Sequence, residues 1–478
     1  RVNGADLRCK IVGEGGNLGM TQKGRIEAAQ KGVLLNTDFI DNSAGVDTSD
    51  HEVNIKILLN DAVQRGELSF DARNTQLAAM TDEVGQLVLW DNYRQNQAIT
   101  LMEHQSVSRI GSMAHFIRTL EAEGTLDRQV ENLPSEAELS ERKTRGLGLT
   151  RPELAVLLSY DKIRLFQQML DSDVPEDPYL SKELVRYFPV PLHEKYAEHM
   201  QRHRLKREII ATAVTNSTIN RMGATFMMRM QEDTGQGPAA IAKAYTAARE
   251  ILEARELWAH IEALDSKVAE DTQIDAIKQI WSLLRHMTRW LLNRPGGSLD
   301  IAANVERYQA SVSALRKALP EVLTPTGKGD FSCSQEKWEG LGMPAELSLR
   351  LARMPELRAA LDMVEVAQQG SQPIEKVAGV FYELGEALDL EWLRDQIEAL
   401  PVEGHWHAQA RGSLLDELNH QHRALALQVL AMSSDRKDVS PVQAWLQRDD
   451  ATLQYTRSML AEILTQNADY PIASVAVR

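Results

Sequence analysis

Residues 7–39 of the chain read LRCKIVGEGGNLGMTQKGRIEAAQKGVLLNTDF, and this stretch decides the expected fold. It begins and ends with β-prone runs, Leu7 to Val12 and Val33 to Phe39. Between them, Thr21 can cap a helix that ends at Gly32, because glycine readily takes the left-handed conformation that follows a helix end. A strand, a helix and a second strand within about thirty residues predict a βαβ unit of a parallel sheet. One such unit cannot cover both faces of a sheet, so more sheet is expected upstream.

The chain after residue 50 is expected to be helical. Two stretches, Ser49-Asp50-His51-Glu52 and Thr150-Arg151-Pro152-Glu153, have the spacing of a capping box, so a helix is predicted to begin at each. Apolar residues at helical spacing predict a long helix at 81–123. Clusters of Gly, Pro, Ser and Thr predict breaks at 233–238 and 324–334.

The composition is that of a soluble globular protein, with 43% hydrophobic and 25% charged residues among 478. A formal net charge of −15 argues against nucleic acid or an anionic membrane surface as a partner. No apolar run reaches the length of about 18 residues that a membrane span needs. Cys9 and Cys333 are far apart and lack metal-ligand spacing, so a cytoplasmic protein without a disulfide framework is expected.

The glycine cluster at 13–19 leaves two interpretations open. Glycines beside a helix N-terminus let a backbone approach a pyrophosphate. The dinucleotide fingerprint G-x-G-x-x-G, counted from Gly13, requires a third glycine where the chain has Leu18. Asp38 lies about twenty residues on, where the fingerprint has a ribose-binding acid, but such a match arises easily by chance. Spacing alone therefore allows a phosphate-binding loop or a plain strand-to-helix turn.

The same stretch resembles the late nucleotide-domain segment of glutamate dehydrogenases, in which the pattern runs E-G-A-N, a helix, G-V-L, then N-A-G-G-V and a Ser three residues later. The matching residues are Glu14-Gly15-Gly16-Asn17, Thr21, Gly32-Val33-Leu34, Asp38, Asn42-Ser43-Ala44-Gly45-Val46 and Ser49. Further on, residues 148–157 and 216–223 are similar to the C-terminal part of the large bacterial NAD-dependent members. The departures, Gly16 for Ala and Ser43-Ala44 for Ala-Gly, exchange one small residue for another.

This resemblance implies oxidation of L-glutamate to 2-oxoglutarate and ammonium with NAD as the cofactor. Gly15, Gly16 and Asn17 then border the nicotinamide end of NAD, and Asn42 lines the same cleft. Ser49 matches the serine that binds the side-chain carboxylate of glutamate. The family's catalytic Lys and Asp precede its nucleotide domain, so no catalytic residue is expected in this chain. The expected partners are the substrate, the upstream catalytic region of the same polypeptide and other copies in a homo-oligomer.

The resemblance and the helical pattern together predict a mainly α fold, in which a short α/β remnant precedes a long all-helical C-terminal region. The remnant, residues 1–50, is the last βαβ of a Rossmann-type nucleotide domain. Helices at 51–145 return to the catalytic core, and two further helical parts follow at 146–235 and 236–478.

Simpler interpretations remain for several of these residues. Ser49 can serve only as a helix cap, and Asn17 after two glycines is ordinary turn composition. His199 and His203 have the spacing of two metal ligands, but four basic neighbours at 202–207 oppose a cation, and no metal is predicted. The H-x-H pairs His405/His407 and His420/His422 lack a thiol or carboxylate partner. For the whole chain, the alternative is a non-catalytic helical regulatory or interaction module.

Overall fold

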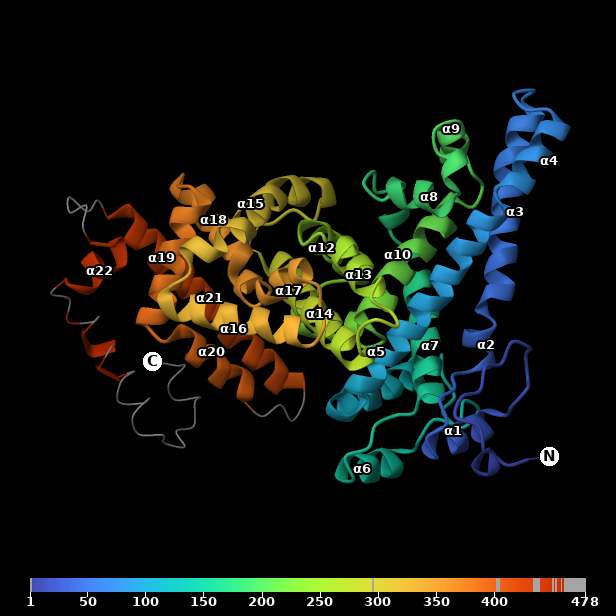
Figure 1. Ribbon diagram of the computed structural model, residues 1–478, viewed down its shortest axis with the longest axis horizontal. Coiled ribbons are helices and arrows are strands. Elements are labelled where there is room, and N and C mark those ends of the chain that lie inside the picture. Colours follow the sequence, from blue (N-terminus) through green and yellow to red (C-terminus); the bar gives the residue numbers. More distant parts are fainter. Residues whose placement is uncertain are drawn as a thin grey trace. The chain divides into compact units, whose positions relative to one another are not determined.

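A computed structural model of the chain describes residues 2–294, 296–400, 405–432, 439–448, 451, 454–456 and 458–459, without the side chains of 405, 406 and 408. The chain forms two compact units (Figure 1). The first comprises residues 1–231 and 236–243, and the second comprises 232–235 and 244–478. Both are built from helices, so the mainly α fold is confirmed.

The first unit contains ten α-helices and three short 3₁₀ helices in its described residues before α11 and α12, which contribute to both units. The elements are η1 (Gly4–Asp6), α1 (Gln22–Gln30), α2 (Asp38–Asp41), α3 (Ser43–Gln64), α4 (Phe70–Ala79), α5 (Thr81–Ala122), α6 (Glu136–Thr144), α7 (Arg151–Leu170), η2 (Val174–Glu176), α8 (Ser181–Tyr187), η3 (Val190–Leu192), α9 (Ala197–Gln201), α10 (Lys206–Met222), α11 (Phe226–Thr234) and α12 (Pro238–Ile251).

The expected βαβ unit is only partly formed. α1 begins after Thr21, whose Oγ1 accepts a hydrogen bond from Gly24 N at 3.1 Å, and it ends before Gly32 at φ +87°, as predicted. The two flanking segments meet at a single parallel bridge, Ile11 to Leu34, and no longer strand is present among the described residues. The prediction of two full strands at 7–12 and 33–39 is therefore wrong. Two parallel segments without neighbours make too few backbone hydrogen bonds for a stable sheet, and the end of the second enters α2.

The centre of the first unit is a helical layer in which α5 packs against α3, α7 and α10, and α7 packs against α10 (Figure 1). α7 supplies a continuous run of side chains, Leu154 to Leu158, that are at most 2% exposed. Burying each leucine side chain of this run contributes roughly 2 kcal/mol to folding. This layer fixes α3, the helix that carries Ser49, onto a rigid support.

The two predicted capping boxes had different outcomes. Thr150 caps α7 as expected, with Glu153 Oε2 accepting from Thr150 N at 2.7 Å. The box at Ser49 is wrong, because α3 already begins at Ser43 and Ser49 lies within the helix. Asn92 of α5 donates to Ser43 Oγ at 2.9 Å and to Ile40 O at 2.8 Å, which holds this earlier helix start in place.

The second unit is also helical. Its elements are α13 (Ala254–Glu262), α14 (Glu270–Asn293), α15 (Ile301–Val322), α16 (Pro325–Gly340), α17 (Ala345–Ala352), η4 (Glu356–Ala359), α18 (Ala360–Gly370), α19 (Ile374–Ala387), α20 (Leu390–Ala399), α21 (His405–Ala431) and α22 (Pro441–Leu446). α15, α18, α19 and α21 pack together as its core.

One predicted break falls inside a helix. α16 begins at Pro325 and includes residues 325–334, because Thr324 caps it by accepting from Gly327 N at 3.1 Å and proline is tolerated in the first turn. The break at 233–238 is confirmed between α11 and α12. Within the described part of the chain, no helix has the length and apolar character needed to cross a membrane.

Candidate functional site

The structure brings two of the predicted cofactor residues together. Asn42 Nδ2 donates a hydrogen bond to Asn17 Oδ1 at 3.1 Å. Asn17 lies in the glycine-rich loop and Asn42 directly precedes α3, so the contact links the loop to that helix. Asn42 is half-buried and Asn17 is exposed, which leaves the amide pair at the surface of the unit.

Acidic side chains that are buried or half-buried hold the glycine-rich loop in shape. Asp41 Oδ2 accepts from Glu14 N at 2.9 Å, and Asp38 Oδ2 accepts from Leu18 N at 2.8 Å. The Arg25 guanidinium joins the two sides of the loop, at 2.6 Å from Glu14 and 3.2 Å from Asp38. Burial alone would raise the pKa of Asp38, but the bonds from Leu18 N and Arg25 outweigh it and hold that pKa below its usual value. Asp38 thus supports the loop, a structural role that its spacing from the glycines did not indicate.

The tip of this loop is open. Gly15 and Gly16 are exposed, and a Cβ atom on either would meet no described atom within 4 Å. The left-handed residue of the loop is Leu18, at φ +64°, and its side chain is 87% exposed. A leucine in this conformation is strained, and the strain is tolerated because Asp38 fixes its backbone N–H. The loop therefore presents free backbone to a ligand or to another part of the polypeptide.

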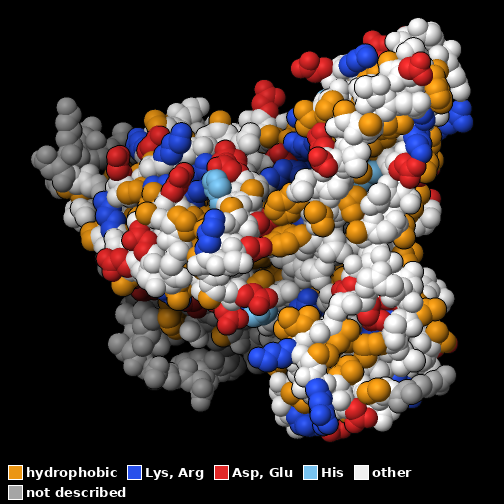
Figure 2. All heavy atoms as spheres, turned by 45° about the vertical axis from the view of Figure 1, so that its right-hand side comes forward, with side chains coloured by type: hydrophobic (Ala, Val, Ile, Leu, Met, Phe, Trp, Pro, Cys, Tyr) orange, Lys and Arg blue, Asp and Glu red, His pale blue; other side chains and the backbone are white. Residues whose placement is uncertain are grey.

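One face of α3 continues this surface. Asn42, Val46, Ser49 and Val53 follow one another at helical spacing, so Asn42 and Ser49 lie on one side, two turns apart. Val46 is 74% exposed and Val53 is 52% exposed. Ser49 is also exposed, and no hydrogen bond involves its side chain among the described residues. Ser49 is therefore not occupied by capping and is available to a ligand. Figure 2 shows hydrophobic side chains exposed among charged ones on the first unit.

Arg151 of α7 connects Asn36, which follows the parallel bridge at Leu34, to helix α5. Its Nε donates to Asn36 Oδ1 at 3.1 Å, and its Nη1 donates to Thr100 and Glu103 of α5 at 2.9 and 2.8 Å. Asn36 Nδ2 in turn donates to Asp41 Oδ1 at 2.9 Å. The Nε and Nη1 groups of Arg151 therefore serve to hold Asn36 and α5 together. This network was missed from the sequence, because its members are far apart in the chain.

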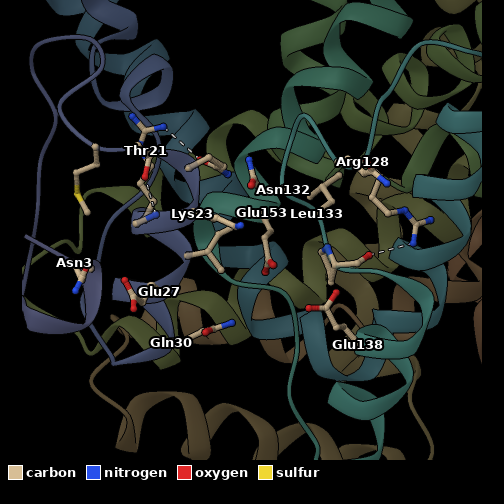
Figure 3. A pocket seen from close by; sticks show the side chains of 18 of the residues that line it. Asn3, Thr21, Lys23, Glu27, Gln30, Arg128, Asn132, Leu133, Glu138 and Glu153 are labelled. Atoms are coloured by element: carbon tan, nitrogen blue, oxygen red, sulfur yellow. Dashed lines mark hydrogen bonds between the residues drawn. The ribbon is translucent and has the colours of Figure 1, made fainter.

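A large polar hollow lies beside the loop and does not include the predicted site. Its volume is about 1310 Å³, and it is lined by η1, α1, the turn at 128–134 and parts of α6 and α7 (Figure 3). Its guanidinium groups are already neutralised: Arg128 lies 2.7 Å from Glu121, and Arg142 lies 2.8 Å from Glu153. None of the five predicted residues lines this hollow.

The histidine pair at 199 and 203 does not form one site. His199 bonds Asp61 Oδ2 at 2.7 Å and Glu67 Oε2 at 2.8 Å. His203 Nε2 instead contacts Asn54 O at 3.0 Å. The two rings thus have separate partners. The side chain of His405 lies outside the described residues.

Comparison with known proteins identifies what the chain is similar to. Residues 146–478 match the family described as "Glutamate dehydrogenase, C-terminal", and residues 1–102 match "Bacterial NAD-glutamate dehydrogenase, catalytic domain". Over its full length the chain is 42% identical to the NAD-specific glutamate dehydrogenases of Halomonas elongata and Pseudomonas aeruginosa, and 34% identical to that of Mycobacterium tuberculosis. It covers 30%, 30% and 29% of these proteins, respectively, so the chain spans under a third of their length.

Proposed function

The chain belongs to the glutamate dehydrogenase family as a portion of its large bacterial NAD-dependent type, and from this premise we propose that it helps to form the active site of such an enzyme. The proposed reaction of the complete polypeptide is the oxidation of L-glutamate with NAD, which yields 2-oxoglutarate, ammonium and NADH. The chain spans 30% of the length of the Halomonas elongata relative, so the activity is assigned to a complete polypeptide and not to residues 1–478 alone.

The contact between Asn17 and Asn42 is the observation that carries this proposal. In our proposal these amides border the nicotinamide end of NAD, and the open backbone at Gly15 and Gly16 lets the cofactor approach closely. Side-chain amides can donate to a carbonyl and accept from an amide, so they suit the carboxamide of nicotinamide.

Ser49 is proposed to bind the side-chain carboxylate of glutamate. Its hydroxyl is exposed, lies two turns along the same face of α3 as Asn42, and has no competing hydrogen bond among the described residues. A separation of seven residues corresponds to about 10 Å along a helix, which allows NAD and glutamate to lie side by side along it.

We further propose that residues 1–50 complete a Rossmann-type nucleotide domain. The parallel bridge between Ile11 and Leu34 supports this, as do the hydrogen bonds Val12 N to Leu34 O and Leu34 N to Lys10 O, both 2.9 Å. Ile11 is 69% exposed and Leu34 is 54% exposed, as expected of parallel segments whose sheet face is not covered by a helix. The helical parts 51–145, 146–235 and 236–478 are proposed to return to the catalytic core and to support it.

The catalytic Lys and Asp of the family are proposed to lie upstream of this chain, so residues 1–478 alone supply no acid or base to the reaction. Assembly as a homo-oligomer in the cytoplasm is part of the same proposal. A purely regulatory helical module is disfavoured, because residues 1–102 match the catalytic-domain family.

Glutamate-dependent formation of NADH, measured for the complete polypeptide and for residues 1–478, tests the proposal. The complete polypeptide should be active and the chain alone should not exceed the blank, because proton transfer and substrate orientation need groups outside it. Activity of the chain alone would refute the assignment of the catalytic groups. A folded complete polypeptide without activity would refute the proposed function.

A further inference from the structure

The face of α3 opposite Asn42 and Ser49 carries a compact group of potential metal ligands. Asp47 and His51 lie one turn apart on α3, and Asp91 of α5 lies across from them. One ligand atom from each of these three residues lies within 4.8 Å of the other two. We refer to Asp47, His51 and Asp91 as the α3–α5 cluster.

The His51 ring is 2% exposed, and neither Nδ1 nor Nε2 has a hydrogen-bond partner among the residues that the structure describes. Nε2 lies 3.9 Å from Asp47 Oδ1. The ring is instead stacked on Tyr187, with centroids 4.4 Å apart. Buried polar groups in folded proteins are almost always satisfied, so an oriented but unbonded imidazole facing two carboxylates indicates a missing ligand.

Two cationic side chains also lie near the cluster. Arg94 lies 3.6 Å from Asp91. Lys162 of α7 faces both carboxylates, but it has no ion pair with either among the described residues. A metal ion seated between the three ligand atoms would compete with these two side chains for the carboxylates.

We propose that Asp47, His51 and Asp91 bind a divalent transition-metal ion, with zinc as the best match. One neutral imidazole and two carboxylates are ligands that zinc accepts, and water completes a tetrahedral set. Magnesium fits less well, because it prefers oxygen ligands alone.

The ion would fasten α3 to α5 behind the face that carries Ser49. Its role is structural, because Asp47 and His51 point away from that face. The site is independent of the proposed reaction, and its test needs no substrate.

The test is zinc binding by the full chain after removal of metals with a chelator, followed by calorimetric titration with zinc chloride. We expect one tight site per chain and a higher melting temperature with zinc, since a ligand that binds only the folded state stabilises it. Asp91→Asn and His51→Gln should each weaken this site at least about tenfold. His420→Gln, which removes an exposed histidine of the second unit, is the control for adventitious binding and should leave the site intact.

Three results would overturn the site. The first is the absence of tight zinc binding by the wild-type chain. In that case Arg94 and Lys162 alone would balance the charge of the two carboxylates. The second is equal zinc affinity in the wild-type chain and in a folded Asp91→Asn variant. This comparison tests the site even if His51→Gln fails to fold. The third is magnesium binding as tight as zinc binding, which would remove the imidazole from the ligand set.

Discussion

Asn42 Nδ2 donates a hydrogen bond to Asn17 Oδ1 across 3.1 Å, although 25 positions separate the two residues in the chain. The contact aligns the open glycine loop with the first turn of α3, and the exposed face of α3 continues from Asn42 through Val46 to Ser49. The positions assigned to NAD and to glutamate therefore share one continuous surface, supported from behind by α5.

Ser49→Ala in the complete polypeptide should raise the KM for glutamate more than the KM for NAD. Loss of a hydrogen bond to a carboxylate costs about 1.5 to 3 kcal/mol, a factor of roughly ten to a hundred or more. The melting temperature should not fall, because Ser49 lies within α3 and alanine favours a helix. Steady-state kinetics with each substrate varied provides the measurement. An unchanged KM for glutamate would remove the substrate role from Ser49.

Arg25→Met should destabilise the chain by about 3 to 5 kcal/mol, because it leaves the buried Glu14 and Asp38 carboxylates without their counter-charge. Arg145→Met is the matched control, since the Arg145 to Glu141 pair is 64% and 66% exposed and should contribute under about 1 kcal/mol. Urea unfolding of both variants measures the difference. Equal stability of the two variants would show that Arg25 does not hold the loop.

His422 should make the second unit less stable in mild acid. Burial lowers the pKa of His422 to about 4, whereas the ring has a value of 6.5 when unfolded. As the pH falls from about 6.5 to about 4, the unfolded chain binds a proton that the folded chain does not, so the free energy of unfolding falls by up to about 1.4 kcal/mol per pH unit. Above pH 6.5 this effect is absent.

Unfolding free energies measured at several pH values for the wild type and His422→Gln test this prediction. Glutamine can still donate to Phe381 O, the bond that His422 Nε2 makes at 3.0 Å, but it does not titrate. The variant should therefore lose less stability in acid. His420→Gln, an exposed position on the same helix, serves as the control. Parallel profiles of unfolding free energy against pH for the wild type and His422→Gln would show that His422 does not cause the loss of stability in acid.

The sequence predicted features that depend on local chemistry. The cap at Thr21, the left-handed Gly32 and the box at Thr150 all formed, because each needs only neighbouring residues. The box at Ser49 has the same spacing and failed, since contacts from Asn92, on a distant helix, favour a helix that begins earlier. The strands predicted at 7–12 and 33–39 did not form in full, because a strand is stable only when other strands pair with it, and those contacts are not local in sequence.

The predicted site residues came from the resemblance and not from periodicity. Periodicity cannot show that Asn17 and Asn42 touch, because long-range contacts leave no repeating pattern. The support of the loop by Asp38 and Arg25 was missed for the same reason. The α3–α5 cluster had one available signal, the spacing of Asp47 and His51 by four residues, but its third member lies on another helix.

The central claim is that Asn17 and Asn42 form one wall of an NAD site, and a double-mutant cycle on the complete polypeptide tests it most directly. The KM for NAD should be measured for Asn17→Ala, Asn42→Ala and the double variant, with circular dichroism to confirm folding. Each single variant should raise this KM by about tenfold, and the double variant should raise it little further, because the two amides act as a bonded pair. An unchanged KM for NAD in all three folded variants would contradict the account.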